Sequence, residues 1–316
     1  MKILIGYDGS ECAAAALEDL KNAGLPKATE ALVISVADVF LPPPIDEEVD
    51  NAFPLQVPTA VRLAHERAAR ELKEADSLAE QASKRLKAIF PEWRIDHGAM
   101  AESPAWALIW RASEWKADLV VVGAEGHSLL GGRLILGSVS QRVAHESTCS
   151  VRIARGGQRD SKLPLKLVIG VDGSVDSATA VSAVCQREWP KGTQAHLVVA
   201  VDTVIAVAPD PTTPSVRKWM EVGPAEQWDQ LRQVFAPLTA KLSAAGLSAD
   251  VIVRKGNPKD ELVDEAKSWG ADCIFVGAHG LRGVERLLLG SVSSAVSARA
   301  HCSVEIVRSK TTRSPT

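Results

Sequence analysis

The chain has 316 residues, of which 46% are hydrophobic and 24% are charged, and its formal net charge is −3. This composition is typical of a globular protein with room for two domains, and it excludes a largely disordered chain. A weak negative charge predicts neither nucleic acid nor an anionic membrane as a partner. The apolar runs all fall short of the ~18 residues that a membrane-spanning helix needs, so we expect no membrane span.

The amino-terminal segment and the cysteines favour a cytoplasmic location. Residues 1–8 reach Gly6 and Asp8 too early for the apolar core of a secretory signal. The five cysteines are an odd number without a CxxC pair, which suits reduced thiols better than a disulfide framework.

The first half of the chain alternates predicted strands and helices. Apolar runs predict buried strands at residues 2–7, 31–36, 93–99, 118–122 and 150–154. Ala-rich or helically spaced segments predict helices at residues 10–20 and 59–90, from 104, and from about 138. Ser103 and Pro104 are typical of an N-cap followed by the first helical position. Five prolines within residues 42–58 exclude a regular element there.

The second half repeats this order. Strands are predicted at residues 166–171, 195–201, 250–254, 272–276 and 303–307, and helices at 174–187, 225–245, 258–269 and 291–300. A Pro-rich loop again follows the second strand, at residues 207–214. Alternating strands and helices predict an α/β fold, with two similar domains that each hold a five-stranded parallel sheet covered by helices on both faces.

Internal repeats support two copies of one unit. Residues 2–10 read KILIGYDGS and residues 166–174 read KLVIGVDGS, while residues 133–140 read RLILGSVS and residues 286–293 read RLLLGSVS. Agreement in the same order predicts a tandem repeat. We therefore expect domains at residues 1–155 and 166–308, a polar linker at 156–165 and a disordered tail at 309–316.

A glycine-rich loop in the second half is suited to holding phosphates. Gly277 and Gly280 follow a predicted strand, and Gly290 and Ser291 follow nine residues later where a helix begins. Glycine lets the backbone approach a ligand closely, and a helix start offers free N–H groups and partial positive charge. The expected amide donors are those of Ser291, Val292 and Ser293. Ligands of such folds bind beyond the carboxyl ends of the strands, where Asp172 also lies.

The pattern Gly-x2-Gly-x9-Gly-Ser, after a first strand that ends in Asp, resembles the ATP-binding motif of the universal stress proteins. The resemblance extends over essentially the whole chain and implies a Rossmann-like fold that binds ATP, with or without Mg²⁺. It would place Asp172 near the adenine and ribose and the backbone of Val201 at the adenine edge. Gly277 and Gly280 would lie along the ribose and phosphates, with Gly290, Ser291 and Ser293 on the phosphates.

The first half departs from this motif. Its loop reads Gly123-Ala124-Glu125-Gly126, and ten residues rather than nine precede Gly137. A carboxylate at Glu125 repels phosphate unless it points away or meets Mg²⁺. We therefore describe the first motif as degenerate, and whether it holds ATP stays open. The corresponding residues are Asp8, Val36, Gly123, Gly126, Gly137, Ser138 and Ser140.

The resemblance implies an ATP-binding regulatory protein of the stress response, and no catalytic or metal-binding residues are expected. Two alternatives stay open. A slow ATP hydrolase would use Arg282 or Arg286 near the phosphates, and a nucleotide-independent scaffold would not need ATP. The closing strands of the two halves would be sheet edges, which are association sites. The resemblance implies that they pair as a dimer-like unit within one chain, and a further homodimer stays open.

Overall fold

The computed structural model describes residues 1–39, 59–125, 136–156, 163–201, 224–280 and 289–309, and every structural statement here concerns these residues. The strands of the first half are β1 (Lys2–Gly6), β2 (Glu30–Ala37), β3 (Arg94–Ala101), β4 (Leu119–Gly123) and β5 (Ser150–Ala154). Its helices are α1 (Glu11–Asp19), α3 (Thr59–Ile89), α4 (Pro104–Trp115) and α5 (Ser138–Glu146), and a 3-10 turn, η1 (Leu20–Asn22), follows α1.

The second half has the same order of elements. Its strands are β6 (Lys166–Gly170), β7 (Gln194–Val201), β8 (Ser248–Lys255), β9 (Cys273–Gly277) and β10 (Ser303–Val307). Its helices are α6 (Val175–Cys185), α8 (Pro224–Ala244), α9 (Pro258–Trp269) and α10 (Ser291–Arg299). The Pro-rich loops expected at residues 42–58 and 207–214, and the tail from residue 310, lie outside the described residues.

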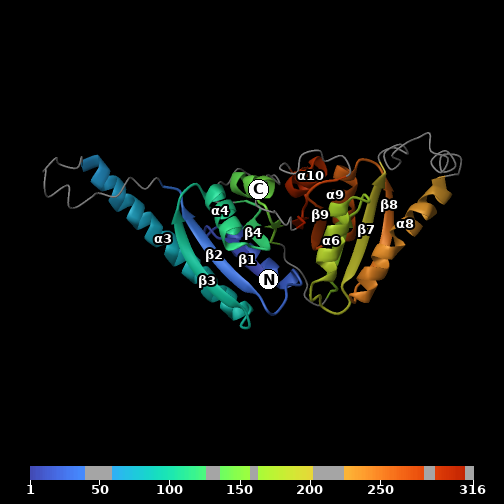
Figure 1. Ribbon diagram of the computed structural model, residues 1–316, viewed down its shortest axis with the longest axis horizontal. Coiled ribbons are helices and arrows are strands. Elements are labelled where there is room, and N and C mark those ends of the chain that lie inside the picture. Colours follow the sequence, from blue (N-terminus) through green and yellow to red (C-terminus); the bar gives the residue numbers. More distant parts are fainter. Residues whose placement is uncertain (40–58, 126–135, 157–162, 202–223, 281–288, 310–316) are drawn as a thin grey trace, which may run out of the picture.

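The ten strands of the described residues form one sheet in the order β3-β2-β1-β4-β5-β10-β9-β6-β7-β8. Strands within each half are parallel, which confirms the predicted pair of five-stranded parallel sheets. The closing strands β5 and β10 pair antiparallel at the centre, so β3 and β8 are the outer edges of the sheet. Figure 1 shows the two halves side by side, with α3 and α8 at opposite ends of the molecule.

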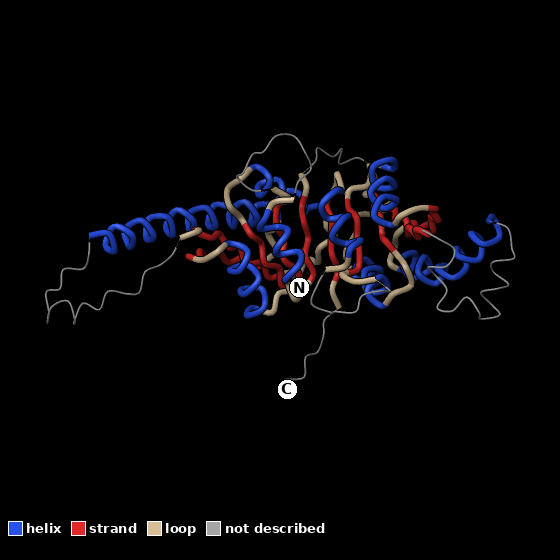
Figure 2. Tube along the Cα trace, turned by 90° about the horizontal axis from the view of Figure 1, so that it is seen from above, coloured by secondary structure: helices blue, strands red, loops and turns tan. Residues whose placement is uncertain are grey.

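The helices divide between the two faces because alternate residues of each strand point to opposite sides. Leu4 belongs to a core with α4, α5, α9 and α10 that continues across both halves. Ile3 and Ile5 belong to a separate core with α1 and α3, and α6 and α8 cover a third core in the second half. One face therefore has a continuous apolar core, whereas the other has two cores with a break at the central strands. In Figure 2 the helices lie on both sides of the strands.

The helix starts show one difference from expectation. Ser103 is the N-cap of α4 and Pro104 its first residue, as predicted, but the Ser103 side chain makes no capping hydrogen bond. Ser10 and Ser174 do cap α1 and α6, accepting hydrogen bonds from the amides of residues 13 and 177 at 3.1 Å. Among the described helices, none is long and apolar enough to cross a membrane.

Candidate nucleotide site

The Asp-Gly-Ser sequence turns the chain from a strand into a helix in both halves. The Asp172 Oδ1 atom accepts a hydrogen bond from the Ser174 amide at 2.9 Å, and Asp8 does the same with Ser10 at 3.0 Å. The intervening Gly173 has a φ of +84°, which favours glycine. One carboxylate oxygen of each Asp therefore stabilises the turn, and the motif has a structural role whether or not a ligand binds.

Gly277 ends β9 where the first turn of α6 packs against it. A methyl group on Gly277 would lie 2.6 Å from the carbonyl carbon of Asp176, which is closer than side chains approach backbone. A methyl group on Gly123 would likewise lie 3.0 Å from the carbonyl carbon of Cys12. Both glycines are required for strand–helix packing at the carboxyl end of the sheet.

The helix starts at Gly290 and Gly137 have the same geometry in both halves. Each glycine is an N-cap in extended conformation, with ψ of 152° and 151°, and its amide donates to Ala278 O or Ala124 O at 2.8 Å. The next three amides have no carbonyl one turn earlier within the helix to bond to. In α10 these amides belong to Ser291, Val292 and Ser293, and in α5 the first belongs to Ser138. Both helix starts thus present donors at the same edge of the sheet.

The Ser293 hydroxyl has a partner within the protein. It donates to Gly277 O at 2.6 Å, and the residue is only 4% exposed. Ser140 donates to Gly123 O at 2.5 Å in the same way. Each hydroxyl proton therefore joins the helix to the glycine at the end of the strand, whereas Ser291 and Ser138 are exposed.

Asp172 and Gly280 come from different loops and meet in space. A methyl group on Gly280 would lie 2.7 Å from the Asp172 Oδ2 atom, so this carboxylate reaches the glycine-rich loop. A methyl group on Gly290 would lie 2.9 Å from Ala278 O. The second half thus brings together the ends of β6 and β9 and the start of α10, three of the segments selected from the sequence.

The strand register corrects the correspondence proposed between Val36 and Val201. Tyr7 N bonds to Ile34 O in the first half, and Val171 N bonds to Val198 O in the second. Counting onward from these bonds, Val201 corresponds to Ala37, and Val36 corresponds to the residue before Val201. Both carbonyls at the matched position are engaged, because Ala37 O accepts from Glu102 N and Val201 O from Gly256 N, each at 3.1 Å. The repeat itself gives the same match, because Asp8 and Asp172 lie 164 residues apart and so do Ala37 and Val201.

A His–Asp pair at the loop was not anticipated. Asp176, in the first turn of α6, accepts from both the amide and the Nδ1 atom of His279 at 3.0 Å. A carboxylate oxygen only accepts hydrogen bonds, so Nδ1 is the donor in this contact and carries a hydrogen. The Nε2 atom of the same ring is buried and has no hydrogen-bond partner within the described structure. The first half has Cys12 and Glu125 at the corresponding positions, so the two loops differ in charge as well as in length.

Other expected residues cannot be placed. Gly126, Arg282 and Arg286 lie outside the described residues. Within the described part of the chain, no group of three or more His, Cys, Asp or Glu side chains is arranged to hold a metal ion. A surface depression at the amino ends of the strands, next to Lys2 and Asp118, lies at the opposite edge of the sheet from the candidate site.

Both halves match the model of the universal stress protein family, over residues 1–155 and 165–308. The chain belongs to the universal stress protein family. A universal stress protein of Mycolicibacterium smegmatis is 31% identical over 201 residues, which cover 61% of this chain and 62% of that protein. The chain thus spans less than two thirds of that relative's length. The universal stress protein YxiE of Bacillus subtilis is 32% identical over 151 residues, or 45% of this chain and 98% of that protein.

Solved structures of universal stress proteins share the fold. The crystal structure of a universal stress protein from Archaeoglobus fulgidus has a TM-score of 0.57 at 20% identity, and the alignment covers 97% of this chain and 96% of that one. A putative universal stress protein from Pseudomonas aeruginosa has a TM-score of 0.56 at 12% identity, covering 97% and 92%. The likeness therefore extends over both halves of the chain.

Proposed function

We propose that this universal stress protein binds ATP at the carboxyl end of the second half and acts as a nucleotide-dependent regulator in the stress response. The observation that carries the proposal is the convergence of Asp172, the Gly277–Gly280 loop and the start of α10 at one edge of the sheet. Glycine at positions 277, 280 and 290 lets α6, the Asp172 carboxylate and the start of α10 approach the loop closely, and the helix start offers amides to an anion.

Each part suits a different portion of the nucleotide. The amides of Ser291, Val292 and Ser293 and the exposed Ser291 hydroxyl would hold the phosphates, helped by the positive end of the α10 dipole. Asp172 Oδ2 would accept a hydrogen bond from a ribose hydroxyl, and Val201 would border the adenine. Mg²⁺, when bound with ATP, would neutralise phosphate charge. The Ser293 hydroxyl would act indirectly, because it donates to Gly277 O.

The first half is the weaker candidate. Its helix start matches that of α10, but its loop carries Glu125 where the second half has His279. A carboxylate there opposes phosphate binding, so we propose one ATP per chain.

Calorimetric titration with ATP, with and without Mg²⁺, tests this function. We expect one site per chain and a large loss of affinity in Asp172→Asn. The matched control is Asp8→Asn, which alters the same turn in the first half and should leave ATP affinity unchanged. Absence of heat at millimolar ATP, or equal losses in the two variants, would reject the assignment.

A slow ATP hydrolase is a second candidate because of one observation. Asp176 holds the His279 ring by its Nδ1 atom and leaves the buried Nε2 atom without a partner within the described structure, which is the arrangement of a histidine that serves as a general base. Long incubation with ATP and Mg²⁺, followed by product analysis, separates the two functions. Turnover that His279→Gln abolishes supports the hydrolase, and intact ATP in the presence of measured binding supports the regulator alone.

A further inference from the structure

The central seam, where β5 pairs with β10, has an approximate two-fold symmetry. Arg152 and Glu305 occupy the same position of the repeat, and they are also direct partners across the antiparallel strands. The symmetry axis therefore passes between them. Any pairing of two like halves would place two identical residues opposite each other at this point.

Several contacts of the seam obey this symmetry. Arg155 N bonds to Ser303 Oγ at 3.0 Å, and Arg308 N bonds to Ser150 Oγ at 3.1 Å. The two arginine side chains also reach across, to Ser297 O at 2.6 Å and to a carbonyl of α5 at 2.7 Å. Like halves would preserve these contacts, so they do not determine which halves pair.

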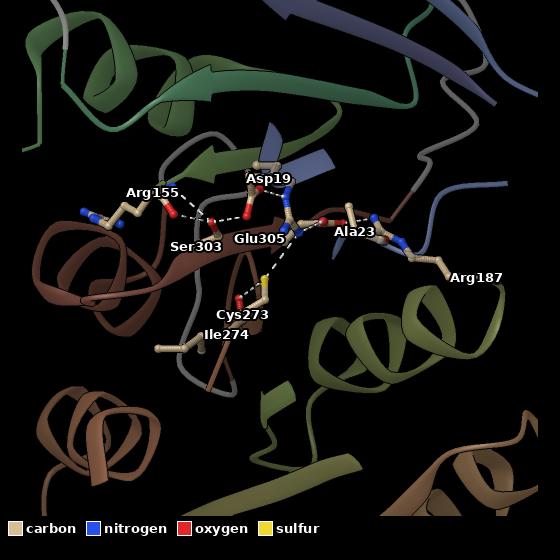
Figure 3. Close-up of polar contacts among 9 residues, drawn as sticks. Asp19, Ala23, Arg155, Arg187, Cys273, Ile274, Ser303 and Glu305 are labelled. Atoms are coloured by element: carbon tan, nitrogen blue, oxygen red, sulfur yellow. Dashed lines mark hydrogen bonds and ion pairs between the residues drawn. The ribbon is translucent and has the colours of Figure 1, made fainter. Parts of the chain in front are cut away.

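The charges at the axis break the symmetry. Arg152 Nε lies 2.7 Å from Asp19 Oδ2, Arg152 Nη1 lies 3.3 Å from Glu305 Oε2, and Glu305 also pairs with Arg187. All four side chains are at most 8% exposed. The order Asp19, Arg152, Glu305, Arg187 thus alternates negative and positive charge across the seam. Figure 3 labels Asp19, Glu305 and Arg187 of this series.

This alternation exists only when unlike halves pair. Two first halves would give the order Asp19, Arg152, Arg152, Asp19, with two arginines facing each other. Two second halves would bring two Glu305 carboxylates together. Like charges this deeply buried are strongly unfavourable, because little water screens them. Arg152 would also lose its contact with Cys273 Sγ at 3.3 Å, since the corresponding residue of the first half is Leu119.

The close packing of Gly24 against Trp189 is a second, independent reason why unlike halves pair. Gly24 packs against Trp189 of the other half, and a methyl group on Gly24 would lie 2.7 Å from the indole ring. Arg187 and Glu188 bond to the carbonyls of Ala23 and Gly24, at 2.7 Å and 2.9 Å. The repeat places Glu188 at the position of Gly24, so two second halves would force a glutamate into the indole.

We propose that the β5–β10 seam is a partner-selective interface, on which each half of the chain fits the unlike half and rejects its own kind. The buried Asp19–Arg152–Glu305–Arg187 series provides the selection by charge, and the Gly24–Trp189 contact provides it by shape. A second copy of the chain can then pair at this seam only when the first half of one copy binds the second half of the other. Two first halves, or two second halves, do not pair.

Three full-length charge reversals test the proposal. The first-half reversal is Asp19→Arg with Arg152→Glu, and the second-half reversal is Arg187→Asp with Glu305→Arg. The first-half reversal places two negative side chains opposite each other at positions 152 and 305, and the second-half reversal places two positive side chains there. The full reversal carries all four substitutions and restores the alternation with opposite signs, so it is the matched control. Urea unfolding midpoints and light scattering are measured for each variant, and again after the two half reversals are unfolded and refolded together.

We expect the full reversal to have a higher unfolding midpoint than either half reversal, although it carries twice as many substitutions. The co-refolded mixture should form a particle of twice the mass of either half reversal alone, because unlike halves from the two chains match in charge. The unfolding midpoint of the mixture should also rise above those of the two half reversals, because the exchanged particle has one seam with native charges and one seam with fully reversed charges. Half reversals at least as stable as the full reversal would overturn the proposal. A mixture that keeps the mass and midpoints of its separate components would overturn it as well.

Discussion

Gly277→Ala is the substitution whose cost the structure defines most closely. The added methyl group would lie 2.6 Å from the Asp176 carbonyl carbon and 2.8 Å from the Asp176 carbonyl oxygen. Ordinary contacts begin at 3.4 Å, so the end of β9 and the first turn of α6 must separate by close to 1 Å. Both are backbone segments held by hydrogen bonds and cannot rotate away. Overpacking of this kind costs about 1–3 kcal/mol of unfolding free energy, and we expect a value near the upper end.

Two further glycines give a graded control. A methyl group on Gly123 would lie 3.0 Å from backbone, and one on Gly98, in β3, would lie 3.7 Å from a flexible Ile34 methyl group. We expect the loss in urea unfolding free energy to decrease from Gly277→Ala through Gly123→Ala to Gly98→Ala, with the last near zero. If the proposed site is correct, Gly277→Ala also weakens ATP binding, because it displaces the loop that leads to Gly280. Equal stability of the Gly277→Ala and Gly98→Ala variants would refute the packing argument.

Three other predictions concern single side chains. Burial raises the pKa of Cys149 from 9.0 to about 11, so its contribution to stability is complete below pH 9 and is lost as the pH rises toward 11. A shift of two pKa units corresponds to about 3 kcal/mol once the loss is complete, and about 2 kcal/mol of this is lost by pH 10.5. Urea unfolding at pH 8 and pH 10.5 should therefore show this additional loss in the wild type relative to Cys149→Ala, and identical pH slopes would contradict it. Ser293→Ala should cost about 1 kcal/mol in urea unfolding, through loss of its bond to Gly277 O. Ser291→Ala should leave the unfolding free energy unchanged and weaken ATP binding in calorimetry. A loss of stability in Ser291→Ala, or a loss of ATP binding without a loss of stability in Ser293→Ala, would contradict the roles assigned to the two serines.

The sequence determined the elements and their order. Apolar runs such as residues 3–5 mark strands because both faces of a covered parallel sheet exclude water. Asp172-Gly173-Ser174 specifies a turn and a helix cap through contacts within a few residues, and its copy at residues 8–10 does the same. Contacts of this kind join residues that are close in the sequence, so they can be predicted without knowing the tertiary structure. The repeat then predicted two similar units with strand ends at one edge.

Tertiary structure alone decided which distant residues meet. Asp176 and His279 are 103 residues apart, and each is unremarkable in its own segment. Arg152 and Glu305 are visible in the sequence as charges within apolar strands, but their burial against each other follows only from antiparallel pairing at the seam. The positions of charges along the chain do not show whether two strands pair parallel or antiparallel. The antiparallel pairing of β5 with β10 is what places Arg152 opposite Glu305.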